Sequence, residues 1–130
     1  MKPKSVRDIM ATKLLTFTPD TKVVAAIKSL VDRKFSGASV VDENGDLVGI
    51  LSEMDCMETV IQNLYYGVSG GDVKDFMSTN VTTVNPEMGI ADLAQMLQET
   101  HFRRLPVVEN GKLIGQRSEE HTSELQSPDH

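Results

Sequence analysis

Apolar residues recur every three to four positions in three parts of the chain, which is the spacing of one helical face. This spacing predicts three amphipathic helices, each with one buried side. The apolar positions of the first predicted helix are Val24, Ile27, Leu30 and Val31. Those of the second are Met57, Val60, Ile61 and Leu64, and those of the third are Ile90, Leu93, Ala94 and Leu97.

Shorter apolar runs between these helices predict β-strands. Two of them, 14–17 and 81–84, precede a helix and are followed by a proline, which ends a strand. Two further pairs of runs flank an Asn-Gly dipeptide. Each pair predicts a hairpin, because both residues of that dipeptide tolerate a positive φ. The predicted hairpin strands are 38–41 with 47–51 and 105–108 with 112–115.

The order of these elements repeats because the sequence itself repeats. Residues 6–10 (Val-Arg-Asp-Ile-Met) return at 73–77 (Val-Lys-Asp-Phe-Met), and the Val-Val segment before each Asn-Gly returns in the same way. Ser5 and Asp72 are each followed three residues later by an acidic residue, which predicts a helix N-cap at both places. The pattern predicts an α+β (mixed α/β) fold made of tandem β-α-β-β-α repeats.

The repeats also predict the domain boundaries. We expect a first domain at 5–64, a glycine-containing linker at 65–71 and a second domain at 72–116. Residues 117–130 are expected to be a non-native tail, because 117–127 read RSEEHTSELQS, which resembles a translated sequencing adapter. The second repeat should therefore lack its closing helix and leave an open edge.

The composition is that of one globular protein, since 39% of the 130 residues are apolar and 25% are charged. The net charge of −6 argues against nonspecific binding to nucleic acid and against attraction to anionic membranes. No apolar run approaches the roughly 18 residues that span a bilayer. The single cysteine, Cys56, cannot form an internal disulfide, which favours a reducing compartment. We therefore expect a cytoplasmic protein.

One candidate binding motif lies where the first hairpin leads into the second predicted helix. Ser52 and Asp55 match a helix-capping box there, which stabilises a helix by about 1 kcal/mol. The same position also suits a nucleotide, because a helix N-terminus attracts phosphate and an aspartate can accept hydrogen bonds from ribose hydroxyls. The residues alone leave both interpretations open, and the two roles are compatible.

The sequence offers neither catalytic machinery nor a metal site. Cys56 has no evident base, since His101 is the only histidine before residue 117. The three histidines lack the spacing of metal ligands. The glycines of the linker lack the lysine of a phosphate-binding loop. We therefore expect a protein that is not an enzyme and binds no metal or cofactor.

The tandem repeat, the Asn-Gly hairpins, and segments 47–55 (LVGILSEMD) and 104–108 (RLPVV) together resemble a cystathionine-β-synthase-type (CBS) domain pair. The resemblance covers residues 5–116. It implies a compact, often dimeric pair that binds an adenosine-containing ligand, such as AMP, ADP or ATP, in a cleft between the two repeats. It also implies a regulatory role toward an attached or partner protein.

The resemblance further implies which residues contact that ligand. Asp55 would bind the ribose with Ser52 beside it, and two arginines would bind phosphate, whose oxygens suit guanidinium groups. The adenine would lie against the first strand of the second repeat, between two apolar side chains. Ser36 stands where the family often has a basic residue. The expected ligand-binding set is Ser36, Ile50, Ser52, Asp55, Val81, Thr82, Phe102, Arg103 and Arg104.

The expected function is that of a regulatory sensor that binds an adenosine-containing ligand, forms a homodimer and acts on an unidentified protein. One alternative is a dimerisation scaffold without a ligand. Another is a regulatory fragment of a larger enzyme or transporter. Ligand binding that is lost in Asp55→Ala would distinguish the sensor from the scaffold. In the second, pseudo-symmetric site the position of that aspartate is taken by His121, in the expected tail.

Overall fold

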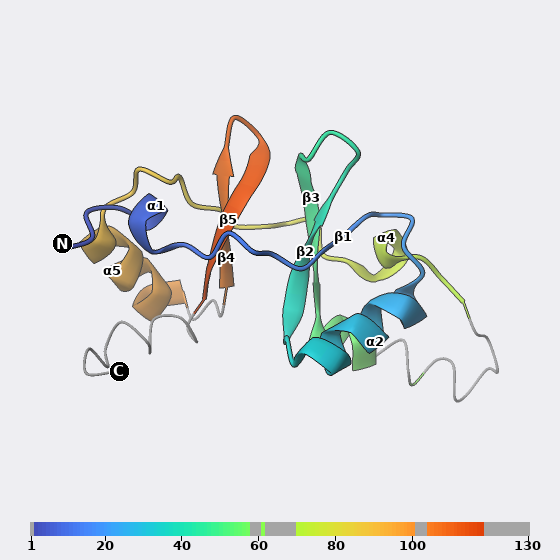
Figure 1. The fold of residues 1–130 in the computed structure, drawn as a ribbon. Coiled ribbons are helices and arrows are strands. Elements are labelled where there is room, and N and C mark those ends of the chain that lie inside the picture. The colour runs from blue at the N-terminus through green and yellow to red at the C-terminus, as the bar shows by residue number, and fades with distance from the viewer. Residues whose placement is uncertain (1, 58–60, 62–69, 101–103, 119–130) are drawn as a thin grey trace. The chain divides into compact units, whose positions relative to one another are not determined.

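The computed structural model describes residues 2–57, 61, 70–100 and 104–118 (Figure 1). The fold is mixed α/β, as the sequence predicts, and its strands form two sheets. Residues 53–57 and 61 are helical in addition to the labelled elements. Within the described residues, no helix has the length and apolar content that crossing a membrane requires. The labelled elements are α1 (Val6–Ile9), β1 (Thr16–Phe17), α2 (Val23–Arg33), β2 (Gly37–Val41), β3 (Leu47–Ser52), α4 (Val73–Phe76), α5 (Ile90–Thr100), β4 (Arg104–Glu109) and β5 (Lys112–Ser118).

The chain divides into two compact units that do not follow the order of the sequence. Unit 2 spans Leu15–Val81, whereas unit 1 combines the residues up to Leu14 with those from Thr82 onward. The short helix that starts each repeat therefore packs with the hairpin of the other repeat: α1 contacts β5, and α4 contacts β3. The sequence repeats at 5–64 and 72–116 give no sign of this exchange, because a repeat pattern records order along the chain and not packing.

Both exchanged helices begin with the predicted capping boxes. In α1 the Asp8 carboxylate accepts the Ser5 N–H (3.2 Å). In α4 the Asp75 carboxylate accepts the Asp72 N–H (2.9 Å). Such caps satisfy N–H groups that have no partner within a helix, which is how helices of only four residues are held.

Unit 2 is a three-stranded sheet that packs against α2 and α4. Strand β1 runs parallel to β2, and β2 runs antiparallel to β3. Helix α4 adds Val73, which is fully buried, to the core between the sheet and α2. The buried residues of this core are Phe17, Ala26, Leu30, Ala38, Val40, Leu51, Cys56 and Val73.

The buried face of α2 differs from the predicted one. The prediction placed Val24 and Val31 inside, but these side chains are 52% and 69% exposed. Val23 and Ala26 are buried in their place, together with Leu30. The predicted and observed faces share Leu30, and Ile27 still packs against the core, so the two faces overlap and differ by less than the 100° that separates adjacent residues. Periodicity alone could not choose between them, and the small side chain of Ala26 favours close packing on the sheet.

Unit 1 is a β4–β5 hairpin that packs against α1 and α5. The two strands are antiparallel, and α5 buries Leu93 on the predicted face. Leu97 packs against the same core, whereas Ala94 is exposed. The buried apolar residues of this core are Val6, Val84, Leu93, Leu105 and Val107.

The predicted strand at 81–84 is reduced to one parallel bridge at Val84, whose N–H donates to the Pro106 carbonyl (3.0 Å). The ladder cannot extend to Thr82, because the next donor would be the N–H that Pro106 lacks. In unit 2 the equivalent residue is Ser39, which has an N–H. There β1 forms a strand of two residues.

The two hairpin turns differ although both contain Asn-Gly. Asn110 and Gly111 have φ values of 54° and 83°, as predicted for a two-residue turn. In the first hairpin Gly45 has a positive φ (85°) but Asn44 does not. That loop is longer, and the Asp42 carboxylate stabilises it by accepting the N–H of Asn44 (2.9 Å).

Strand β5 continues into the segment that was expected to be a tail. Arg117 pairs with Leu105, and its side chain is only 3% exposed. Its Nη1 donates to the Ile9 carbonyl (3.3 Å). Because ladder bonds join backbone groups, a strand can extend through residues of any polarity. The sheet thus ends two residues past the predicted boundary at 116, and residues 119–130 lie outside the described part.

Candidate functional site

The candidate site is centred on the turn from β3 into the helical segment 53–57, where Ser52 and Asp55 form a reciprocal capping box. The Asp55 Oδ2 accepts both the Ser52 N–H (2.9 Å) and the Ser52 hydroxyl (3.0 Å). In return, the Ser52 Oγ accepts the Asp55 N–H (3.3 Å). Both side chains are half-buried. The capping role of this pair is confirmed, and the box fixes the position of the Asp55 carboxylate.

The start of this helix has fewer available N–H groups than the sequence suggests. The Glu53 N–H donates to the Ser36 carbonyl (2.9 Å), and the Asp55 N–H donates to Ser52. A phosphate bound here would replace two existing hydrogen bonds, each worth about 1 kcal/mol. The geometry therefore favours a ribose contact to the carboxylate over a phosphate at the helix start. It also brings the backbone of Ser36 next to the capping box.

Ile50 lies two residues before Ser52 in β3 and is half-buried. Its N–H donates to the Ser78 carbonyl (2.9 Å), and its carbonyl accepts the Ser78 N–H (2.8 Å). These two bonds hold the segment that leads to Val81 beside β3. Val81 is a half-buried residue at the end of unit 2, whereas Thr82 is a half-buried residue of unit 1.

The expected aromatic and basic residues fall largely outside the described part of the chain. Phe102 and Arg103 lie outside it, and so does His121 of the second site. Arg104 is the first residue of β4, and it pairs with Ser118 through the strand ladder. Its side chain lies outside the described part. The phosphate contacts of the two arginines stay a prediction.

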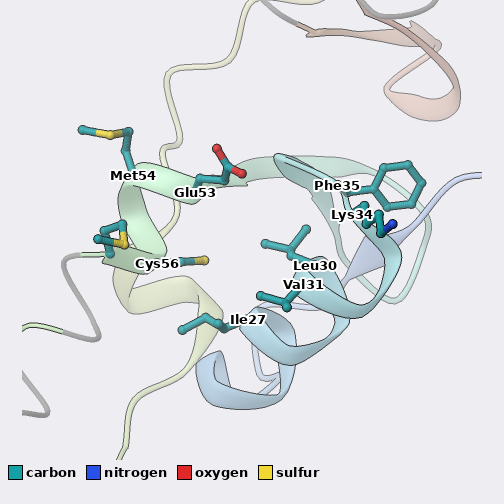
Figure 2. A pocket seen from close by; sticks show the side chains of 9 residues that line it. Ile27, Leu30, Val31, Lys34, Phe35, Glu53, Met54 and Cys56 are labelled. Atoms are coloured by element: carbon teal, nitrogen blue, oxygen red, sulfur yellow. The ribbon is translucent and has the colours of Figure 1, made fainter.

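Unit 2 has a surface groove that sequence reasoning missed (Figure 2). It lies between α2 and the helical segment 53–57 and has a volume of about 730 Å³. The sequence did contain one of its lining residues among the apolar positions of α2. Val31 was predicted to lie in the core, but it is exposed and lines the groove. The lining residues are Ile27, Leu30, Val31, Lys34, Phe35, Glu53, Met54, Cys56 and Met57.

Cys56 lines this groove at the edge of the core. Burial, followed by the negative charges of Asp55 and Glu53, raises the pKa of its thiol to about 11. A thiol with this pKa is protonated near pH 7 and is a poor nucleophile. Within the described residues, no group of three or more His, Cys, Asp or Glu side chains is placed to hold a metal ion.

Comparison with known proteins places these features in a family. The CBS domain profile matches residues 6–62 and 73–116. The CBS domain-containing protein YhcV of Bacillus subtilis is 34% identical over 113 residues, which cover 85% of this chain and 77% of YhcV. The chloroplastic CBS domain-containing protein CBSX2 of Arabidopsis thaliana is 32% identical over an alignment of 139 positions, which covers 85% of this chain. The chain spans 58% of the length of CBSX2, and 38% of the length of protein MJ1225 of Methanocaldococcus jannaschii.

The fold agrees with the sequence match. The crystal structure of CBSX2 in complex with AMP matches with a TM-score of 0.84 at 33% identity, covering 98% of both chains. The CBS domain pair of protein MJ0100 has the same fold, with a TM-score of 0.81 at 24% identity. The two profile matches span most of the sequence and coincide with its two repeats. The chain therefore belongs to the CBS domain family and contains a pair of CBS domains.

Proposed function

We propose that this CBS domain pair is a non-catalytic sensor that binds an adenosine-containing ligand and regulates another protein. The observation that carries the proposal is the match to CBSX2, whose structure contains AMP, over 98% of both chains. We propose further that the working form is a homodimer. The ligand class is that of AMP, ADP and ATP.

In this proposal Asp55 binds the ribose, and the capping box orients its carboxylate toward the ligand. A carboxylate has about four acceptor positions, so one side chain can serve both the helix cap and ribose hydroxyls. Ser52 lies beside the ribose, and Ser36 flanks it through the backbone contact to Glu53. Ile50 supplies an apolar wall from β3, the strand that ends at Ser52.

The remaining contacts would come from two segments of the second repeat, residues 81–82 and 102–104. Val81 and Thr82 would contact the adenine, and Phe102 would form the second apolar wall. Arg103 and Arg104 would bind phosphate oxygens, for which a planar guanidinium fork is well suited. The high pKa of the Cys56 thiol supports a binding role over a catalytic one at this site, because that thiol is not poised as a nucleophile.

Thermal unfolding of the full chain with AMP, ADP, ATP and S-adenosylmethionine tests the proposal. A ligand at 100 times its Kd adds about 2.7 kcal/mol of stability, which is several degrees in Tm. We expect at least one adenosine-containing ligand to raise Tm, and we expect Asp55→Ala to remove that shift.

The matched control is Asp75→Ala. Asp75 occupies the same position of a capping box in α4, so its loss removes a comparable cap. It should lower the starting Tm and leave the ligand-induced shift intact. If no ligand raises Tm while the protein folds and dimerises, the chain is a scaffold and the sensor proposal is wrong.

A further inference from the structure

The first strand segment of each repeat pairs with its hairpin to a different extent. In unit 2 the parallel ladder of β1 extends to Thr16, which lies opposite Ser39. In unit 1 the equivalent segment forms one bridge, between Val84 and Val107, and within the described residues it pairs no further toward its N-terminus. The sequence repeat places Thr83 where unit 2 has Thr16, so the ladder of unit 1 stops one pair short.

Pro106 is the cause of this difference. The Val84 N–H donates to the Pro106 carbonyl, and the Val84 carbonyl accepts the Val108 N–H (both 3.0 Å). Because the bonds of a parallel ladder are evenly spaced, the next bond toward the N-terminus would run from the N–H of residue 106 to the Thr82 carbonyl. Proline has no N–H and cannot form this bond. The position of this proline is fixed, because its side chain is fully buried.

The carbonyl of Thr82 is therefore available to a ligand. Thr82 is half-buried, and within the part of the chain that the structure describes its carbonyl accepts no hydrogen bond. A carbonyl that is partly removed from water and unpaired costs free energy, which a ligand N–H can recover. In unit 2 the equivalent carbonyl belongs to Leu15, and Ser39 supplies the N–H that Pro106 lacks. The strand edge that is open in unit 1 is thus closed in unit 2.

We propose that Pro106 is a positioning residue that leaves the Thr82 carbonyl open to the exocyclic amino group of adenine, and that Ser39 denies unit 2 the same contact. The inference rests on the proposed function and deepens it, since it names the atom that selects the base and the residue that exposes it. A site built around a hydrogen bond to a ligand N–H rejects analogues that lack this group, because its acceptor stays unpaired. The chain should therefore have one base-selective site, in unit 1.

Isothermal titration calorimetry of the full chain tests the contact with two nucleotides. AMP carries the amino group, whereas purine riboside 5′-monophosphate has a hydrogen in its place and is otherwise identical. We expect AMP to bind roughly tenfold more tightly or better, at one site per chain. Equal affinities for the two nucleotides, or a second site in the same chain that also prefers AMP, would overturn the inference.

Pro106→Ala tests the role of the proline, because it restores the N–H and should extend the ladder to Thr82. We expect AMP binding to weaken roughly tenfold and the preference for AMP over purine riboside 5′-monophosphate to disappear. Hydrogen exchange followed by NMR should show that the new amide at position 106 is protected. An unprotected amide, or an unchanged preference for AMP, would overturn the role of Pro106.

The matched control is Pro86→Ala, which removes the second fully buried proline of unit 1 and leaves this ladder unchanged. It should keep the preference for AMP even if it lowers Tm, because a loss of stability alone does not change the ratio of two ligand affinities. A preference that disappears equally in Pro86→Ala and Pro106→Ala would overturn the inference.

The same titrations separate this inference from the sensor proposal. A folded wild type that binds neither nucleotide nor any other adenosine-containing ligand contradicts the sensor, and the inference is then wrong with it. A wild type that binds AMP and purine riboside 5′-monophosphate equally well contradicts this inference alone.

Discussion

Replacing Gly49 with alanine tests how the segment after α4 is held on the sheet of unit 2. A Cβ at Gly49 would lie 2.6 Å from the Met77 sulfur and 3.0 Å from the Ser78 carbonyl oxygen. The thioether of Met77 can move aside, but the carbonyl is held by the Ile50 N–H at 2.9 Å. The added methyl group must therefore push the two backbone segments apart.

We expect Gly49→Ala to lower the free energy of unfolding by about 1–3 kcal/mol, which is the usual cost of overpacking. Urea denaturation followed by circular dichroism measures this change. Gly70→Ala is the matched control, because a Cβ at Gly70 meets no atom within 4 Å. Replacing glycine with alanine makes the unfolded chain less flexible, and in both variants this stabilises the folded state by about 0.4–1 kcal/mol. The difference between them isolates the contact with the segment after α4.

Equal urea midpoints for Gly49→Ala and Gly70→Ala would refute this reasoning. A double-mutant cycle with Met77→Ala then assigns the cause, because removing the thioether should recover part of the loss if the clash is steric. The repeat predicts the same behaviour in unit 1. There a Cβ at Gly115 would crowd Met10 and lie 3.1 Å from the Ala11 carbonyl oxygen.

Three further predictions concern the units and their titratable groups. Circular dichroism should show that the fragment 15–81 is folded and that the fragment 1–71 is not, because the fragment 1–71 lacks the fully buried Val73 of α4. A folded fragment 1–71 would contradict the exchange of helices. Iodoacetamide at pH 8 should modify Cys56 roughly 100-fold more slowly than an unperturbed thiol, since its pKa is about 11, and urea should abolish the difference. Backbone hydrogen bonds from Lys4 and then from Ser5 lower the pKa of Asp8 in the folded state. The Asp8 carboxylate therefore stabilises the fold at any pH above its unfolded pKa of about 3.8, and this stabilisation is lost as the pH falls through the lower folded pKa. The wild type should therefore exceed Asp8→Asn in urea midpoint at pH 7 and lose that advantage at pH 2, and a gap that persists in acid would contradict the assignment.

Features set by neighbouring residues could be predicted from the sequence. The hairpins and the caps at Ser5, Ser52 and Asp72 depend on residues that are close to each other in the sequence, and the repeat is a direct property of the sequence. They are found in the structure. The second Asn-Gly turn has a positive φ at both residues, as predicted, because its loop has only two residues. In the first turn Asn44 does not have a positive φ, because the longer loop needs one only at Gly45.

Features set by tertiary packing could not be predicted in the same way. The buried face of α2 includes Val23 and Ala26 and not Val24 and Val31, and this choice depends on which of two overlapping faces meets the sheet. The exchange of α1 joins residues that are about 80 to 110 positions apart, as in the hydrogen bonds from Arg7 to Glu87 (3.0 Å) and Glu109 (2.8 Å). The exchange of α4 joins residues that are closer in the sequence, as in the hydrogen bond from Lys74 to Asp20 (3.3 Å). The groove was missed for the same reason, because assigning Val31 to the core hid the exposed face that it shares with Met54.

The capping boxes show why the Ser-x-x-Asp motif alone could not identify a ligand site. Asp8, Asp55 and Asp75 all occupy the third position of a helix and all accept the N–H of the capping residue. The three carboxylates differ in their surroundings, since Asp8 and Asp75 are exposed and Asp55 is half-buried just after the β2–β3 hairpin. A carboxylate that served only as a cap would gain nothing from partial burial, which weakens its hydration. The comparison of Asp55→Ala with Asp75→Ala therefore separates the two roles, because both lose a cap and only the first should lose a ligand.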